Sequence, residues 1–211
     1  MEAISARLVF RKRASASLDS YTLAMQVMPS SLSIVVYPDA VLRRRALPVP
    51  AVNDEVRAVA ERMIRLMFEA EGIGLAAPQV GLSWRLFVAH VPEGDDRSAS
   101  EVPPSATLTP QVYINPVLSK PVGELKAMEE GCLSLPEIRG DVYRPQTITM
   151  SALGLDGQPL VRTATGLLAR CWQHEIDHLD GTLIIDRMTQ MSRLKNRSAV
   201  RDLEKQKPRK K

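Results

Sequence analysis

The segment from Leu168 to Asp180 limits the fold of this chain more than any other, because it contains the pattern H-E-x-x-H between His174 and His178. On an α-helix, residues four positions apart differ by about 40° around the axis and by roughly 6 Å along it. The two histidines therefore point the same way, one turn apart, and can bind one metal ion. Since the chain has only three histidines, two unrelated surface histidines are the weaker interpretation.

Glu175 occupies a different position on the same helix. It lies about 60° from His178 around the axis, where its carboxylate can reach a water held by the ion without being a ligand itself. Apolar residues at helical spacing form the buried stripe of this helix. We therefore expect the ion between the helix and the core, in a partly dry pocket where a Lewis acid acts most strongly. The stripe consists of Leu168, Cys171, Trp172, Ile176 and Leu179.

Length and composition favour one globular domain with terminal extensions. The chain has 211 residues, of which 45% are hydrophobic and 25% charged, as is usual for a soluble domain. No apolar run approaches the ~20 residues that span a bilayer, so we expect no membrane association. Two cysteines leave no disulfide framework, which favours a reducing compartment. We predict a flexible leader at residues 1–31, a catalytic domain at 32–190 and a basic helix or tail at 191–211.

The leader leaves the location of the protein open. Residues 1–31 hold four Lys or Arg, six Ser and two acidic residues, a composition that also fits a weak transit peptide for a mitochondrion or plastid. A start codon upstream of the true start at Met25 or Met28 would give the same pattern. Without a long apolar stretch and a cleavage site, secretion is not expected. We favour a dispensable leader on a cytoplasmic bacterial protein, with organellar targeting as the alternative.

The positive charge of the chain is concentrated at its C-terminal end. Residues 193–211 contain nine Lys or Arg and two acidic residues, a net charge of +7, whereas residues 1–192 carry −3. Such a segment is either a solvated, frayed tail or a contact for RNA or another polyanion. Both interpretations stay open.

The order of expected elements indicates an α+β fold. An extended segment at 32–37 precedes a helix that Asn53 caps and Gly72 ends. Strands follow at 86–91 and 112–116, and a hairpin spans 147–163 around an Asp-Gly turn. We expect mainly antiparallel sheets packed around the central metal-binding helix, with one helix in the N-terminal half and one at the C-terminal end. His90 falls on a strand with no partner nearby in sequence, so we interpret it as structural.

A glycine-rich loop, residues 72–81, follows the first helix. Its three glycines let the backbone approach another group closely, but it lacks both common phosphate-binding registers. The plain interpretation is an ordinary glycine-rich loop. Gln79 within it can donate its amide N–H to an anionic oxygen, which makes it a candidate oxyanion donor.

Two cysteines compete for the place of third metal ligand. Cys132 lies in a short glycine-preceded turn, whereas Cys171 lies on nearly the same helical face as the histidines. Along the helix axis, however, Cys171 and His178 are about 10.5 Å apart, too far for one ion to bind both. We therefore prefer Cys132 and assign Cys171 and Leu167 to a pocket wall.

Together these motifs closely resemble the signature of peptide deformylases. They are the segments 72–79, 130–134 and 173–178, and the likeness extends from about Val36 to Asp186. The resemblance implies an α+β fold and removal of the formyl group from N-formylmethionine on new polypeptides, with release of formate. It also implies one Fe²⁺ per chain, for which Ni²⁺, Co²⁺ or Zn²⁺ can substitute. The implied ligands are Cys132, His174 and His178.

The resemblance further implies roles for residues around the ion. Glu175 transfers the proton of the attacking water, while Gln79 and the backbone N–H of Leu133 donate to the oxyanion. The residues expected to bind the substrate are Gly72, Ile73, Gly74, Arg139, Leu167 and Cys171. The groups expected to support the ligands from behind are Glu130, Arg144 and Asp177.

Two other classes of protein share parts of this pattern. A zinc metallopeptidase also has H-E-x-x-H, but a cysteine ligand upstream of the helix argues against it. A non-catalytic ribosome-binding protein would explain the basic tail, yet it would have no use for Glu175 and Gln79. We expect N-formylmethionyl nascent peptides as substrates and a monomer, with the ribosome as the candidate partner of the tail.

Overall fold

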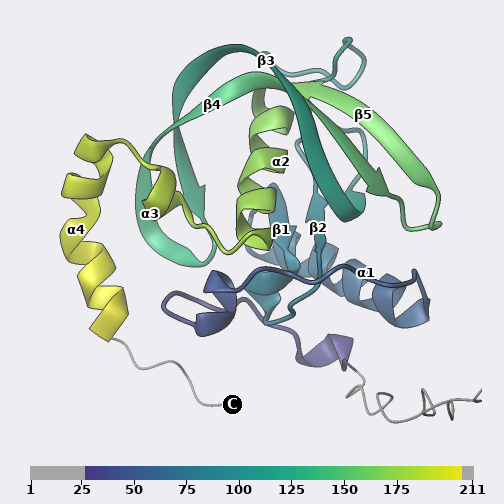
Figure 1. Cartoon of the computed structure of the whole chain (residues 1–211), viewed down its shortest axis with the longest axis horizontal. Coiled ribbons are helices and arrows are strands. Elements are labelled where there is room, and N and C mark those ends of the chain that lie inside the picture. The colour runs from purple at the N-terminus through teal and green to yellow at the C-terminus, as the bar shows by residue number, and fades with distance from the viewer. Residues whose placement is uncertain (1–26, 206–211) are drawn as a thin grey trace, which may run out of the picture.

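The structure is a computed structural model that describes residues 27–205 of the chain. Residues 1–26, most of the expected leader, and residues 206–211, the end of the basic tail, lie outside the described part. Within it, one antiparallel sheet curves around a central helix, and shorter helices cover the remaining sides (Figure 1). The expected α+β fold is confirmed.

The sheet has five strands that follow each other in space as they do in sequence, each antiparallel to the next. Two short strands are buried throughout, and their sequences of small and apolar residues suit that environment. The long middle strands carry the curvature. The strands are β1 (Gly74–Ala76), β2 (Leu86–Ala89), β3 (Gln111–Cys132), β4 (Leu135–Leu153) and β5 (Pro159–Thr165).

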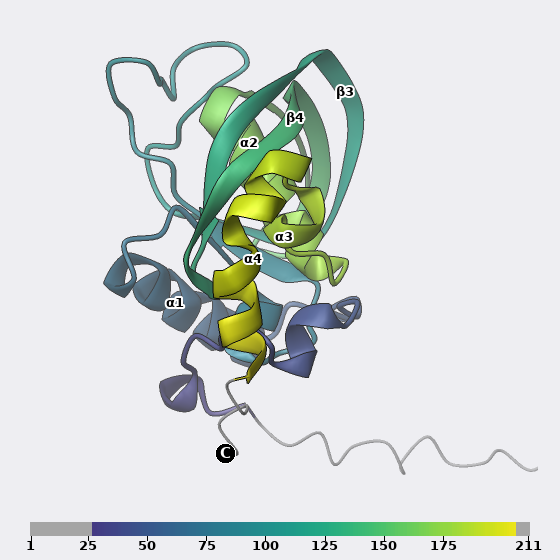
Figure 2. The ribbon, with the colours of Figure 1, turned by 90° about the vertical axis from the view of Figure 1, so that its left-hand side faces the viewer.

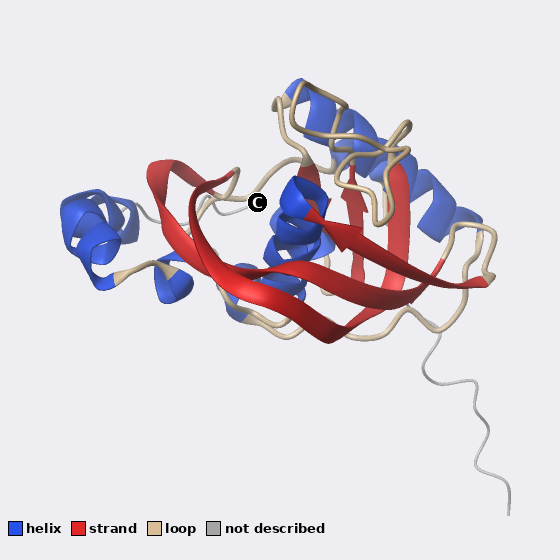
Figure 3. Cartoon of the chain, turned by 90° about the horizontal axis from the view of Figure 1, so that it is seen from above, coloured by secondary structure: helices blue, strands red, loops and turns tan. Residues whose placement is uncertain are grey.

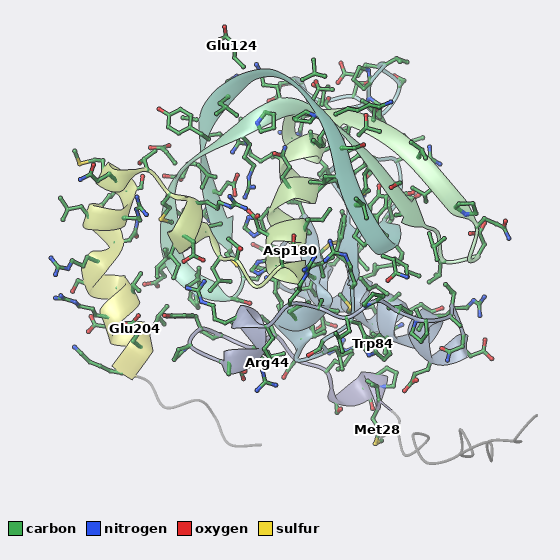
Figure 4. All side chains as sticks on the ribbon, viewed as in Figure 1. Met28, Arg44, Trp84, Glu124, Asp180 and Glu204 are labelled. Carbon is green, nitrogen blue, oxygen red and sulfur yellow. The ribbon has the colours of Figure 1, made fainter. Side chains whose placement is uncertain are left out.

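The hairpin of β3 and β4 bends because its pairing is interrupted. Irregularities in register fall between Ile114 and Val117, between Ser119 and Val122, and again before Leu125, and bulges of this kind increase the bend and twist of a strand. Viewed from above, the two strands sweep around one side of the central helix (Figure 3). Glu124 projects outward at the crest of β3 (Figure 4). The concave side of the hairpin faces the central helix (Figure 3).

The central helix is α2 (Gly166–Leu179), and it contains the H-E-x-x-H segment. Its apolar stripe packs into a core in which the Trp172 ring meets the Tyr113 ring of β3 edge to face, with centroids 5.4 Å apart. The loop between β2 and β3 meets its first turn, where the Leu168 N–H donates to the Ser105 carbonyl. Gly181, at φ +75°, follows the helix in the conformation that glycine adopts at least cost.

The first helix, α1 (Asp54–Glu69), begins as its sequence predicts. The side chain of Asn53 accepts a hydrogen bond from the Val56 N–H at 3.0 Å, which satisfies one of the free donors of the first turn. Its buried face packs on β1 and β2. Ahead of it, η2 (Pro29–Ser31) lies against α1, and the Val27 N–H donates to Glu55 Oε1 at 2.7 Å.

Two helices complete the C-terminal side. A single turn, α3 (Ile184–Arg187), leads to α4 (Gln190–Lys205), which lies on the outer side of the β3–β4 hairpin, apart from α1 (Figure 2). Ser192 and Asn196 dock α4 on β4. Ser192 Oγ accepts from the Asp141 N–H at 3.0 Å, and Asn196 Nδ2 donates to the Arg139 carbonyl at 2.7 Å.

Two further helical turns, η3 (Ala40–Arg43) and η4 (Ala77–Val80), lie in the connections before α1 and after β1. Most expected elements are present, including the hairpin, in which Leu153 pairs with Pro159. The strand expected at 112–116 is too short, because β3 continues to Cys132. The residues of β3 after Pro116 are largely exposed, so they show no apolar alternation. None of the helices within residues 27–205 combines the length and hydropathy that a bilayer span needs.

Candidate metal centre

One end of β3 and one face of α2 bring three ligand-type side chains together. His174 and His178 lie one turn apart with ring centroids separated by 5.0 Å, and Cys132 Sγ lies 3.2 Å from His178 Nε2. One ligand atom from each of the three residues lies within 4.8 Å of the other two. A thiolate and two imidazoles are a donor set that suits a divalent transition metal, so these residues fit a bound ion.

The Glu130 carboxylate, also on β3, supports His174 from behind. Its Oε2 lies 3.0 Å from His174 Nδ1, which leaves Nε2 of that ring free for a metal, an arrangement common at metal-binding histidines. Arg144 holds the same carboxylate with two bonds, Nε to Oε1 at 2.7 Å and Nη2 to Oε2 at 2.9 Å. Burial alone would raise the pKa of Glu130, but the hydrogen bonds from His174 and Arg144 outweigh it and hold the pKa well below its ordinary value.

Arg144 links this carboxylate to a second one on α2. Its Nη1 donates to Asp177 Oδ2 at 2.9 Å. Arg187 of α3, which lies at the protein surface, donates to Asp177 Oδ1 at 2.7 Å. Glu130, Arg144 and Asp177 are all buried. The three residues expected behind the ligands therefore form one connected network.

Glu175 is buried beside the three ligand-type residues and is not among them. Its Oε2 has no hydrogen-bond partner within the described part of the chain. Burial, the largest influence, raises the pKa of the Glu175 carboxyl to about 7. A carboxyl group with that pKa can accept and return a proton near neutral pH.

The two histidines differ in basicity. Burial lowers the pKa of His178 well below its ordinary value. For His174, burial acts in the same direction, but the hydrogen bonds to Cys132 and Glu130 outweigh it and raise the pKa. A metal binds only the neutral imidazole, so an ion bound by His174 would displace a proton.

Gln79, at the end of η4, points its amide into the same region. Its Oε1 accepts from the Ala76 N–H at 2.8 Å, which fixes the side chain, and Nε2 then lies 3.4 Å from Ser134 Oγ and 3.6 Å from Cys132 Sγ. Gln79 and Ser134 are buried. The amide N–H groups therefore face the candidate metal centre, as an oxyanion donor requires.

A cavity of about 540 Å³ opens at this centre. It is a groove lined by residues at and just before β1, by residues around the β3–β4 turn and by residues of α2 that include Glu175. Every residue expected to bind substrate lines it, as do two of the expected ligands. The predicted catalytic, substrate-binding and metal-binding residues that line the cavity are Gly72, Ile73, Gly74, Gln79, Cys132, Leu133, Arg139, Leu167, Cys171, His174 and Glu175.

The structure also separates the competing side chains. Cys171 lies in the cavity wall, where its Sγ–H donates to the Ile73 carbonyl at 3.4 Å, and burial raises the pKa of its thiol well above the ordinary value. His90 lies away from the centre with Nδ1 3.0 Å from Thr107 Oγ1 and its ring against Phe68. Neither residue belongs to the group of ligand-type side chains.

Comparison with known proteins identifies the family. Residues 31–194 match the sequence model of the polypeptide deformylase family. The chain belongs to the peptide deformylase family. Peptide deformylase 2 of Gloeobacter violaceus is 44% identical over 74% of this chain and 79% of its own length, and peptide deformylase 1 of Pseudomonas syringae is 43% identical over 83% and 95%.

Solved structures agree with this assignment. The peptide deformylase of Ehrlichia chaffeensis has a TM-score of 0.75 at 35% identity, covering 82% of this chain and 95% of that one. The Plasmodium falciparum peptide deformylase complex with inhibitor has a TM-score of 0.71 at 36% identity, covering 82% of this chain and 100% of that one. This family is metal-dependent, and the chain is accordingly a hydrolase that removes the N-formyl group from newly made polypeptides and releases formate.

Sequence reasoning missed two residues near the centre. Ser134, fully buried, lies beside the Gln79 amide. Arg170 is buried behind Glu130 and donates to it at 2.6 Å. Its spacing of four residues from His174 was the available signal, because it puts Arg170 on the face of α2 that carries the ligands.

Proposed function

We propose that Cys132, His174 and His178 hold the catalytic metal and that Glu175 is the proton-transfer group of the deformylation reaction. The observation that carries this proposal is the meeting of the three ligand-type atoms within 4.8 Å, with the buried Glu175 carboxyl beside them. When bound, the ion supplies Lewis acidity, which activates water and stabilises negative charge. The remaining steps depend on the side chains of this chain.

Glu175 accepts the proton of the attacking water at its carboxylate and later delivers it to the leaving amine nitrogen. The pKa near 7 suits both transfers. The attack converts the formyl carbonyl to a tetrahedral oxyanion, to which Gln79 Nε2 and the Leu133 backbone N–H donate. Cleavage of the C–N bond gives formate and a free α-amino group.

The cavity supplies the substrate site. Gly72, Ile73 and Gly74 form one side of the groove, along which an extended peptide pairs by backbone hydrogen bonds. Leu167 and Cys171 wall the pocket of the methionine side chain, and Arg139 contacts the peptide beyond it.

For the metal itself we propose Fe²⁺, with Ni²⁺, Co²⁺ and Zn²⁺ as substitutes. A thiolate with two imidazoles accepts all four ions. Elemental analysis of protein purified without oxygen, alongside formate release, tests this assignment. Zinc alone in the fully active protein would contradict it.

The two cysteines provide the test of the site. We expect Cys132→Ser to lose the metal and formate release from a formyl-methionyl peptide, because a hydroxyl is a poor substitute for a soft thiolate. Cys171→Ser, the matched control, keeps the metal and much of the activity. Unformylated peptide serves as the control substrate and should not be cleaved by any of the proteins. Metal loss in Cys171→Ser with retention in Cys132→Ser would reverse the assignment.

We also propose contact with the ribosome through α4 and the tail that follows it. Arg193, Arg197 and Arg201 recur every fourth residue on α4 and line a second cavity of about 330 Å³ together with Tyr37 and Arg43. All three α4 arginines are exposed. Such a row can contact successive phosphates of RNA.

Substitution tests the contact better than truncation, because removing α4 would also remove the docking residues Ser192 and Asn196. We expect Gln at the three arginine positions to weaken co-sedimentation with ribosomes and flatten its dependence on salt. A matched variant carries Gln at Arg65, Lys120 and Arg162, which are exposed elsewhere, and should bind as the wild type does. Equal binding by both variants would contradict the proposal.

We further propose that the protein acts as a monomer in the bacterial cytoplasm. The support is that the relatives named from Gloeobacter and Pseudomonas are bacterial and that both cysteines are free. Light scattering at micromolar concentration and cell fractionation test the two statements. A dimer, or recovery from an organelle that imports residues 1–31, would overturn them.

A further inference from the structure

Arg170 joins the central helix to both long strands at a single point. Its Nη2 donates to the Lys126 carbonyl of β3 at 2.7 Å, and its Nη1 donates to the Val142 carbonyl of β4 at 3.0 Å and to Glu130 Oε1 at 2.6 Å. The side chain is 7% exposed. An arginine this buried, with three acceptors in fixed positions, is held in one conformation.

These contacts complete the hydrogen bonding of Glu130. Oε1 accepts from Arg144 and Arg170, and Oε2 accepts from Arg144 and lies against His174 Nδ1. A carboxylate has about four acceptor positions, so all of them are used. Since the contacts come from Arg144 on β4 and from Arg170 and His174 on α2, Glu130 is held against rotation while both arginines are in place.

The electrical balance of the network also depends on Arg170. The buried acidic groups are Glu130 and Asp177, and the buried basic groups are Arg144 and Arg170. Arg187 pairs with Asp177 from the surface, with 53% of its side chain exposed. Removal of Arg170 would leave Glu130 with Arg144 as its one remaining arginine partner, and it would take a donor from the carbonyls of Lys126 and Val142, which is a costly state.

We propose that Arg170 is a positioning residue for metal binding: by fixing Glu130 it sets the orientation and the tautomer of His174. The inference rests on the proposed function, in which His174 is a ligand. With its Nδ1–H directed at Glu130, the ring presents Nε2 to the ion. Arg170 acts only through Glu130 and touches neither the ion nor the reacting atoms.

The test measures how fast a chelator removes Zn²⁺ from the loaded protein. We expect release from Arg170→Met to be faster than from the wild type by up to about 10–100-fold, the cost of losing Glu130 itself as the outer partner of His174. Arg170→Lys should fall between them, because lysine restores the charge but cannot reach two carbonyls and Glu130 together. Arg187→Met, the matched control, removes a surface arginine of the same network and should stay within about twofold.

A second readout separates positioning from simple stabilisation. In the metal-free protein at alkaline pH, where the ring is neutral, the ¹⁵N shifts of His174 should show one tautomer in the wild type and a mixture in Arg170→Met. A purely structural role would lower the melting temperature of the metal-free protein and leave both the shifts and zinc release unchanged. That result would overturn the inference. If Arg170→Met does not fold, the same comparison with Arg170→Lys decides it.

Failure of this inference differs from failure of the ligand assignment. Cys132→Ser and His174→Gln should lose zinc whatever Arg170 does. If these two variants keep zinc, the proposed metal centre is wrong and the inference falls with it. If they lose zinc while both Arg170 variants release it at the wild-type rate, only the role of Arg170 is wrong.

Discussion

Gly74 and Glu175 lie so close that no side chain fits between them. A Cβ atom built on Gly74 would lie 2.8 Å from Cδ of Glu175, closer still to its Oε1, and 2.9 Å from Sγ of Cys171. The backbone of β1 thus forms a wall against the proton-transfer group. The close approach explains why the glycine-rich segment needs glycine here, with no reference to phosphate binding.

We therefore expect Gly74→Ala to displace Glu175 and to lower kcat about 100-fold, since a misplacement of about 1 Å can cost that much. Metal content should stay near that of the wild type, because the atoms nearest to the new methyl group belong to Glu175 and Cys171, neither of which is a proposed ligand. Gly131→Ala in the same cavity is the matched variant. Its Cβ would meet nothing closer than 3.4 Å, from the end of Arg139, so its loss should be much smaller. Equal kcat values for the two variants would contradict the view that the Gly74 backbone holds Glu175 in position.

Glu175→Gln tests the proton-transfer role directly. Glutamine keeps the size of the side chain but cannot accept the proton of water, so we expect kcat to fall about 10²–10⁴-fold. Metal content and the affinity for a formylated peptide should change little, because Glu175 lies beside the proposed metal ligands and is not one of them. Turnover near that of the wild type would refute the role.

The sequence was sufficient for the features that depend on local periodicity. The spacing of His174 and His178 placed both rings on one face of α2, and Asn53 marked the start of α1. Helix rise alone separated Cys171 from His178, and the structure brings Cys132 to the two histidines. The assignment of Cys132 as a metal ligand stays a prediction. Periodicity is enough for these features because each concerns residues on one element or a distance along one axis.

Features that depend on strand register could not be obtained in the same way. The carbonyls of Lys126 and Val142 meet Arg170 only because β3 and β4 pair in one register with several irregularities. Residues 117–129 carry mixed polar and apolar side chains and are almost all exposed, so their alternation is weak. The long hairpin and the buried contacts of Arg170 were therefore missed together.

The N-terminal extension gives a graded prediction for stability. Deleting residues 1–26 should leave formate release unchanged. Extending the deletion to residue 31 removes η2 and the hydrogen bond from Val27 to Glu55, which we expect to cost about 1–2 kcal/mol. In a domain of this size that is about 2–4 °C in Tm for each kcal/mol. The two deletions compared by calorimetry test this, and a large loss already with residues 1–26 would show that they pack on the domain.

The two cysteines should respond differently to air. Cys132 is half-buried beside both histidines and lines the cavity, where its sulfur is open to oxidants. Cys171 is buried, and the raised pKa of its thiol keeps it protonated and unreactive.

With Fe²⁺ bound, both the ion and the Cys132 thiolate are oxidisable, so we expect activity to be lost in air and oxygen to be added to Cys132. Protein loaded with Ni²⁺ should keep its activity for much longer, because nickel is far harder to oxidise. Peptide mass spectrometry of the two loaded forms, taken as activity decays, measures this. Oxidation of Cys171 before Cys132 would show that burial does not protect it and that the ligand assignment needs revision.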